Sequence, residues 1–128
     1  MPREVVLDAS ALLALIHDEP GAAQVAACIP GALVSAVNLA EVVGKLAEAG
    51  MPRDEIRMAL SGLGLRVVPL DEALAFEVGL LRPATRALGL SLGDRACLAL
   101  AAEARLPAVT ADRSWQELAT AATVETIR

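Results

Sequence analysis

Five short apolar stretches occur along the chain, and segments with a helical pattern separate each of them from the next. The stretches are EVVLD (4–8), ALVS (32–35), LRVVP (65–69), PAVT (107–110) and TVETI (123–127). Apolar strands that alternate with helices predict an α/β fold with a mostly parallel five-stranded sheet flanked by helices. The length of 128 residues predicts a single domain over residues 1–128.

Acidic residues stand where the predicted strands end, and in open parallel sheets functional sites lie beyond the carboxyl ends of the strands. Asp8 ends the first strand, and Asp112 follows the fourth. Asp94 opens the helical segment 93–105, which leads into the fourth strand, so the chain should carry Asp94 and Asp112 to the same edge. Glu41 lies near the start of the helix that follows the second strand. We therefore expect four carboxylates to meet at one edge of the sheet.

Each of these acids also has a purely structural explanation. Asp8 could cap the following helix, although Ser10 could do so equally well. Glu41 follows Asn38 by three residues, which is a variant of the capping box, and its place on the helix also suits a solvent-facing side chain. Asp94 lies on the inward stripe of its helix, where an unpaired carboxylate is costly without a cation or several donors. Asp112 could cap a short helix, but residues 114–117 form a capping box of their own and leave Asp112 spare.

Four acids at one edge would repel one another unless a cation bound among them. Ligands that are all oxygen favour hard ions, here Mg²⁺ or Mn²⁺. His17 is the only histidine and is expected at the surface, so a histidine-based zinc site is excluded. Carboxylate-held Mg²⁺ is typical equipment for the hydrolysis of phosphate esters.

The composition bounds the class of protein. Hydrophobic residues make up 55% of the chain, and the mean hydropathy of +0.54 suggests apolar surface that a partner or self-association covers. No apolar run reaches the roughly 18 residues that a membrane helix needs, and Asp8 interrupts the only candidate signal peptide. Cys28 and Cys97 are far apart and are expected to be buried, reduced thiols in a cytoplasmic protein.

The charge argues against a nucleic-acid binder of the electrostatic kind. The net charge is −5, Lys45 is the only lysine, and the chain has one Trp, one Phe and no Tyr. A basic patch and a base-stacking platform are therefore both missing from the sequence. Any binding of RNA should be weak and should depend on shape.

Three segments together resemble a known family. VVLDASALLALI (5–16), SAVNLAEVV (35–43) and LSLGDRACLALAAEARLPAVTADRSW (90–115) are similar to PIN domains, in particular to the VapC-type toxins of bacterial toxin–antitoxin pairs. The resemblance spans the chain in the right order, and the segment 90–115 is its most specific part. It implies a metal-dependent endoribonuclease that hydrolyses RNA, often tRNA or rRNA, with metal-activated water. It also implies a homodimer and a cognate antitoxin that blocks the acidic cleft.

The resemblance assigns roles to particular residues. Its acidic quartet falls on Asp8, Glu41, Asp94 and Asp112, with Asp8 and Asp94 on the principal Mg²⁺ or Mn²⁺, Asp112 assisting, and Glu41 at a second metal or at the attacking water. Supporting positions next to these acids fall on Ser10, Asn38 and Thr110. Arg95 and Arg113 flank two of the acids and could contact phosphate, although solvated surface arginines explain them as well. Trp115 could stack on a base, but packing under a loop explains it better.

Other classes fit less well. A phosphotransfer receiver domain needs a lysine after its last strand, and a haloacid-dehalogenase-like phosphatase needs an acid where Ser10 stands. A non-catalytic PIN-like binding scaffold is the main alternative, although such scaffolds usually lose acids of the quartet. The helical pair at 38–50 and 52–64, with a turn at Gly50-Met51-Pro52, is where we expect the dimer or antitoxin interface.

Overall fold

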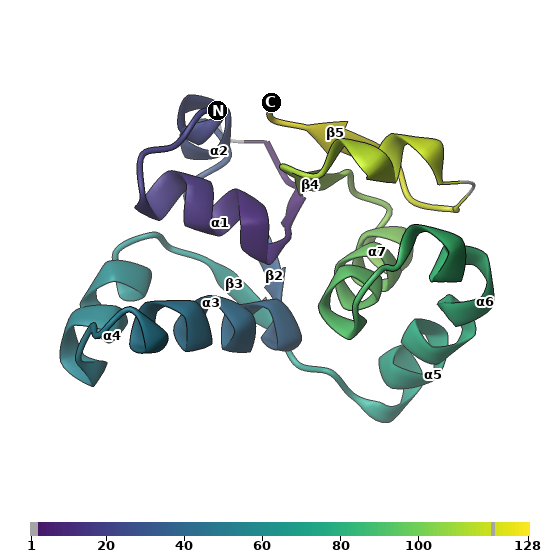
Figure 1. The fold of residues 1–128 in the computed structure, drawn as a ribbon, viewed down its shortest axis with the longest axis horizontal. Helices are drawn as coiled ribbons and strands as arrows, with labels where there is room; N and C mark the ends of the chain where they lie inside the picture. The colour runs from purple at the N-terminus through teal and green to yellow at the C-terminus, as the bar shows by residue number, and fades with distance from the viewer. Residues whose placement is uncertain (1–2, 119) are drawn as a thin grey trace.

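A computed structural model describes residues 3–118 and 120–128 of the chain (Figure 1). Its strands are short, and they lie at β1 Val6–Leu7, β2 Leu33–Ser35, β3 Arg66–Val68, β4 Ala108–Thr110 and β5 Val124–Thr126. Its helices are α1 Ala9–Ile16, α2 Ala22–Ala26, α3 Ala36–Glu48, α4 Arg53–Ser61, α5 Glu72–Leu80, α6 Arg82–Thr85 and α7 Leu92–Ala104. Two 3₁₀ turns complete the elements, η1 Arg86–Leu88 and η2 Arg113–Glu117.

The strands form one sheet in the order β3-β2-β1-β4-β5, and all four neighbouring pairs are parallel. The predicted five-stranded α/β fold is confirmed, and the sheet is wholly parallel. Each strand lies inside the stretch predicted for it but is shorter, because the regular ladder ends where a helix or turn takes over the backbone hydrogen bonds. At Asp8 this change is already complete, since Asp8 is the N-cap residue of α1.

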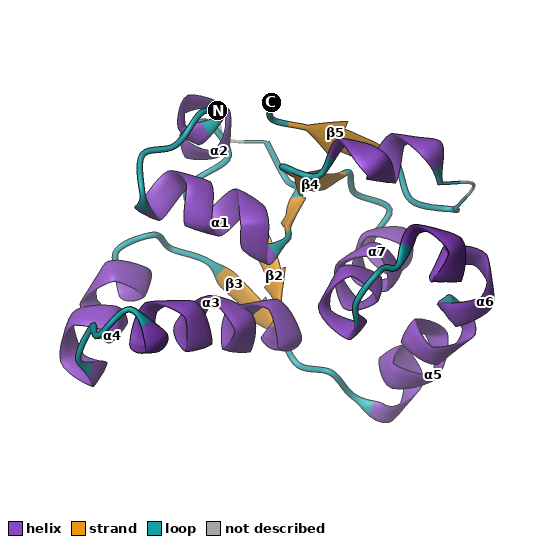
Figure 2. Cartoon of the chain, viewed as in Figure 1, coloured by secondary structure: helices purple, strands orange, loops and turns teal. Residues whose placement is uncertain are grey.

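Helices cover both faces of the sheet, with α1–α4 on one side and α5–α7 on the other (Figures 1 and 2). Val5 and Leu7 pack in the cluster with α1 and α3, whereas Val6 packs in the cluster with α5 and α7. This alternation follows from the two-residue period of a strand. The first strand is therefore buried on both faces, which gives the residue at its end a rigid support.

Several smaller predictions are also confirmed. Helices α3 and α4 form the predicted pair around the turn at residues 50–52. Cys28 and Cys97 are buried, free thiols. His17 is exposed at the C-cap of α1. Within residues 3–118 and 120–128, no helix has the length and apolar character needed to cross a membrane.

Candidate metal centre

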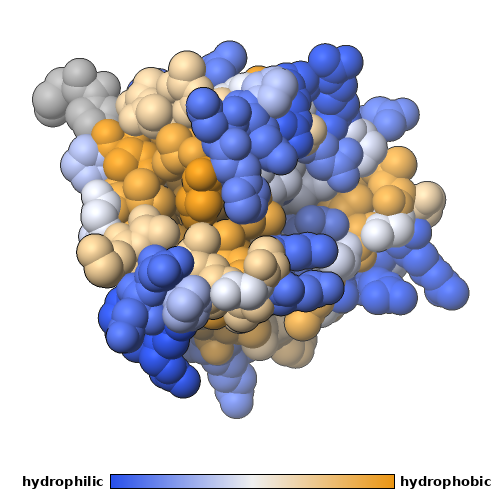
Figure 3. All heavy atoms as spheres, turned by 60° about the vertical axis from the view of Figure 1, so that its left-hand side comes forward, coloured by the Kyte–Doolittle hydropathy of each residue, from blue (hydrophilic) through white to orange (hydrophobic). Residues whose placement is uncertain are grey.

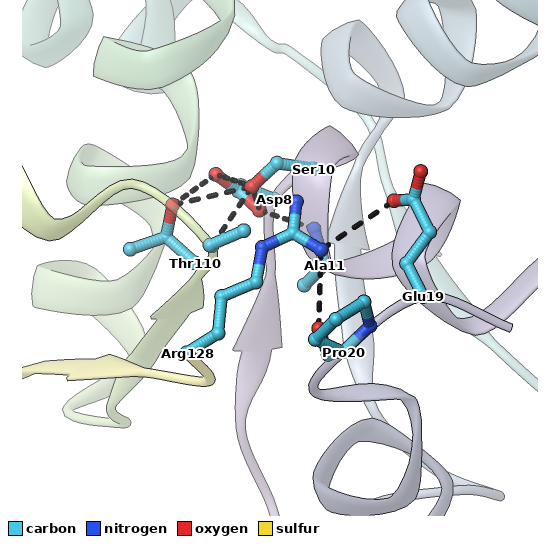
Figure 4. A network of polar contacts seen from close by, with 8 residues as sticks. Asp8, Ser10, Ala11, Glu19, Pro20, Thr110 and Arg128 are labelled. Atoms are coloured by element: carbon cyan, nitrogen blue, oxygen red, sulfur yellow. Dashed lines mark hydrogen bonds and ion pairs between the residues drawn. The ribbon is translucent and has the colours of Figure 1, made fainter. Parts of the chain in front are cut away.

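Asp8 is the centre of a hydrogen-bond network at the carboxyl edge of the sheet (Figure 4). Its side chain is 3% exposed and accepts a hydrogen bond of 2.8 Å from the Ala11 amide, so Asp8 caps α1. The Ser10 hydroxyl, which was the other candidate for this cap, donates instead to the Asp8 carboxylate at 2.7 and 2.9 Å. Asp8 can therefore cap α1 and take part in a functional site at the same time.

Thr110, at the end of β4, completes the network around Asp8. Its hydroxyl is fully buried and donates to Asp8 Oδ2 at 2.6 Å. Both hydroxyls also accept from the backbone that follows β4, since the Ala111 amide donates to Ser10 Oγ at 2.9 Å and the Asp112 amide to Thr110 Oγ1 at 3.0 Å. Because each hydroxyl accepts a fixed backbone N–H, its proton is directed at Asp8. The supporting positions predicted at Ser10 and Thr110 thus contact the first acid directly.

The charge of Asp8 is poorly balanced by the protein. Burial is the main cause that raises its pKa from 3.8 to about 6, and the hydrogen bonds from Thr110, Ala11 and Ser10 offset only part of this effect. The negative charge of Asp94 raises the pKa further. Among the described residues, the ion pairs join other acids to arginines and none involves Asp8. A cation between Asp8 and Asp94 would stabilise the ionised form of Asp8.

Glu41 is held by its own helix and by the start of α7. Asn38 is 1% exposed, and its Nδ2 donates to Glu41 Oε1 at 2.9 Å and to the Gly93 carbonyl at 3.0 Å. The Glu41 carboxylate lies so close to Gly93 that a β-carbon there would overlap it. The capping-box explanation of Asn38 and Glu41 is wrong, because Ser35 is the N-cap of α3 and donors from Asn38 turn Glu41 toward α7.

Asp94 lies in the first turn of α7, three residues after the N-cap Ser91. The two form a capping box, in which the Ser91 amide donates to Asp94 Oδ2 at 2.9 Å and the Asp94 amide donates to Ser91 Oγ at 3.1 Å. Asp94 is half-buried, as the inward stripe of the helix predicts. The box fixes the Asp94 side chain at the N-terminal end of α7.

Three of the acids lie within electrostatic range of one buried thiol. Cys97 is fully buried on α7, and burial is the main cause that raises the pKa of its thiol. The charges of Asp8, Asp94 and Glu41 raise that pKa further. Carboxylates from the end of β1, from α3 and from α7 therefore lie within electrostatic range of the same sulfur. The sequence predicted that acids meet at this edge of the sheet, but it did not predict a buried thiol near them.

The hydrogen bonds of Asp112 differ from those of the other three acids. The expectation that it is spare is wrong, because it is the N-cap of η2 and accepts from the Ser114 amide at 2.9 Å and the Ser114 hydroxyl at 2.7 Å. The 3₁₀ turn begins two residues earlier than the capping box at 114–117 implied, so Asp112 replaces Ser114 as the cap. The backbone of Asp112 is still joined to the site through Thr110.

The two arginines that were considered as phosphate contacts lie in different environments. Arg95 is neither a phosphate contact nor a solvated surface residue, because it is buried and its guanidinium donates to the Val78 carbonyl at 3.1 Å on α5. Both explanations that the sequence offered for Arg95 are therefore wrong. Arg113 is exposed, and its Nε donates to the Arg128 carbonyl at 2.7 Å. Trp115 is fully buried, which confirms packing and excludes base stacking.

The donor set fits a hard divalent cation. Within the described residues, no three acidic, histidine or cysteine side chains form a preassembled cage for a metal. Mg²⁺ commonly binds through only one or two carboxylates and keeps several waters, so a cage of this kind is not required. The buried Asn38 Oδ1 has no hydrogen-bond partner in the part of the chain that the structure describes. The chemistry of these residues therefore suits an ion with oxygen ligands.

Comparison with known proteins leads to the same family as the sequence motifs. The model of the PIN domain family matches residues 5–121. The chain belongs to the PIN domain family. The match contains all the acids of the site and the whole of the central sheet except β5. No curated protein sequence matches the chain.

Several solved structures share the fold of this chain. A toxin–antitoxin complex from Klebsiella pneumoniae contains a chain with 22% identity and a TM-score of 0.77, covering 97% of this chain and 98% of that one. VapBC2 from Rickettsia felis, bound to a promoter DNA fragment, gives 16% identity, a TM-score of 0.75 and coverages of 98% and 100%. VapBC-5 from Mycobacterium tuberculosis gives 26% identity, a TM-score of 0.57 and coverages of 99% and 99%.

Proposed function

We propose that this PIN domain is a Mg²⁺- or Mn²⁺-dependent endoribonuclease and the VapC-type toxin of a toxin–antitoxin pair. The observation that carries the proposal is the buried Asp8 carboxylate, which three hydrogen-bond donors orient and no cationic side chain of the described residues neutralises. A rigid, oriented and uncompensated carboxylate next to Asp94 is a costly arrangement for stability alone. It becomes favourable when a divalent ion binds.

Each residue has a role in this proposal. Asp8 and Asp94 would hold the ion, and Ser10 and Thr110 keep Asp8 oriented by donating to it. Glu41, held by Asn38, would act at a second ion or orient the attacking water. When bound, the ion would act as a Lewis acid and would lower the pKa of a water molecule that it binds. Asp112 would assist from the end of β4.

The substrate proposed is RNA, and its binding should be weak outside the metal centre. The chain carries a net charge of −5, and of the two arginines considered only Arg113 is exposed close to the acids. A divalent ion offsets the local negative charge where a phosphate must lie. Recognition would then depend on the shape of a folded RNA such as tRNA or rRNA.

The proposed antitoxin would bind an apolar groove on the α3–α4 side of the molecule. The groove has a volume of about 630 Å³, and its lining includes Leu39, Val43, Ile56, Leu60, Arg53 and Arg57. Figure 3, which brings this side of the molecule forward, shows apolar surface bordered by hydrophilic areas. Apolar walls with two arginines fit an amphipathic segment that carries acidic side chains. Arg53→Glu with Arg57→Glu should weaken protection by the cognate antitoxin.

We also propose that the chain forms a homodimer. Large apolar side chains are exposed on the other side of the sheet, Phe76 by 67% and Leu80 by 60% on α5, and Leu92 by 53% on α7. Helices α5 and α7 pack together, so both helices bring apolar surface to one side of the molecule. Sedimentation should give a dimer that Phe76→Glu dissociates. A monomeric unsubstituted chain would refute this proposal.

The decisive experiment is cleavage of total tRNA and rRNA by protein free of antitoxin. The reaction is run with Mg²⁺ or Mn²⁺, with EDTA, and with the Asp94→Asn variant. Asp71→Asn is the matched control, because Asp71 caps α5 from an exposed position. Discrete fragments that disappear with EDTA and with Asp94→Asn support the nuclease. A folded protein that neither cleaves RNA nor binds Mn²⁺ would instead be a non-catalytic PIN-like scaffold.

A further inference from the structure

We infer that Gly93 is a positioning residue of the metal centre, because the absence of its side chain creates the space that the Glu41 carboxylate occupies. This inference rests on the proposed metal-dependent function and adds a residue that touches neither the ion nor RNA. Gly93 lies in the first turn of α7, directly before Asp94, and is buried. A glycine inside a helix is less favourable than alanine, so its presence here calls for a cause.

The cause is a steric one. A β-carbon built at Gly93 would overlap both carboxylate oxygens and the carboxyl carbon of Glu41. The backbone conformation of Gly93 is helical, so it is the space and not the main-chain geometry that requires glycine. At two other helical glycines, Gly44 on α3 and Gly79 on α5, such a β-carbon would meet no atom of the described residues within 4 Å. Gly93 therefore differs from them in a contact with one acid of the site.

Asn38 closes the other side of the same space. Its Nδ2 donates both to Glu41 Oε1 and to the Gly93 carbonyl, so a single amide group joins α3 to the start of α7. Its two donor positions are used on these two acceptors, which fixes the orientation of the amide. Glu41 is thus held between a donor from its own helix and the bare Cα of Gly93. The two elements that carry Glu41 and Asp94 are brought together at this contact.

The Gly93→Ala variant should distinguish a role of Gly93 in positioning Glu41 from a role in folding. The atoms that a methyl group meets are the far end of a flexible side chain, so Glu41 can swing away while α7 stays intact. Gly93→Ala should therefore remain folded and lose the placement of one carboxylate. Because this inference takes Glu41 as a ligand of the second ion, we expect the Mn²⁺ affinity of Gly93→Ala to fall at least about tenfold, within the roughly 10–100-fold range typical when a group that orients a metal ligand is lost.

The experiment is calorimetric titration of the whole chain with Mn²⁺ alone, together with thermal unfolding in EDTA. Gly79→Ala is the matched control, and it should bind Mn²⁺ like the unsubstituted chain while its Tm rises by roughly 2–4 °C from helix propensity. Glu41→Ala empties the space beside Gly93. In that background, Gly93→Ala should raise Tm as Gly79→Ala does and should not weaken Mn²⁺ binding further.

The outcomes distinguish this inference from the function on which it rests. If the unsubstituted chain binds Mn²⁺ and Gly93→Ala binds it equally well, Gly93 does not position Glu41 and the inference fails alone. If Gly93→Ala lowers Tm equally in the unsubstituted chain and in the Glu41→Ala background, its effect lies in helix packing, and the inference fails as well. If the unsubstituted chain binds no Mn²⁺, the proposed metal centre fails, and the role of Gly93 fails with it.

Discussion

Replacing Asp8 by asparagine should stabilise the metal-free protein at neutral pH while it removes the proposed function. Asp8 is almost completely buried, and its pKa is raised from 3.8 to about 6 in the folded state. The folded state therefore holds this proton more tightly than the unfolded state does. With respect to this group, stability is highest below about pH 4 and is lost as the pH rises through about 6.

The magnitude follows from the same pKa. Each pKa unit corresponds to about 1.4 kcal/mol, so the raised pKa of Asp8 represents about 3 kcal/mol of stability lost at pH 7. An asparagine side chain at this position carries no charge and keeps an oxygen that can accept from the Ala11 amide, as Asp8 does now. Asp8→Asn should therefore raise the free energy of unfolding by about 2–3 kcal/mol at pH 7 and change it little at pH 4.

The assay is urea unfolding in EDTA at pH 4 and pH 7, with Asp71→Asn as the control. Asp71 caps α5 through the Leu74 amide as Asp8 caps α1 through the Ala11 amide, but from an exposed position. The control should change the free energy of unfolding by at most about 1 kcal/mol. Saturating Mn²⁺ should then stabilise the unsubstituted chain and leave Asp8→Asn unchanged. An Asp8→Asn variant less stable than the unsubstituted chain at pH 7 would refute the reasoning.

Four further outcomes are expected. Asp94→Asn should lower RNA cleavage at least roughly 100-fold, measured with saturating Mg²⁺. Thr110→Val should weaken Mn²⁺ binding about 10-fold in calorimetry because Asp8 loses its shortest hydrogen bond, whereas Thr126→Val on the neighbouring strand should not. The affinity for Mn²⁺ should fall as the pH is lowered through about 6, since protons then compete for Asp8, and a flat profile between about pH 5 and 7.5 would contradict this. Trp115→Ala should lower the free energy of unfolding by about 3–5 kcal/mol in urea, because the indole is fully buried.

The sequence alone was sufficient for the plan of the molecule. Short apolar runs marked all five strands, and the intervening helices indicated a mostly parallel sheet. From the rule that sites lie at the carboxyl ends of such strands, the sequence also predicted that Asp8, Glu41, Asp94 and Asp112 meet at one edge, and the first three lie within electrostatic range of Cys97. The prediction of the fold is confirmed because it depends on local periodicity and on chain direction, both of which consecutive residues determine.

Only the tertiary structure decided which groups each side chain contacts. Ser10 and Thr110 are 100 residues apart, and both can donate a hydrogen bond to Asp8 because β1 pairs with β4. Arg95 was expected at the surface and is buried against α5, because the packing of α5 on α7 sets its exposure. The space at Gly93 likewise exists only once α3 and α7 meet. Distances between side chains far apart in sequence depend on the packing of whole elements, which local patterns do not specify.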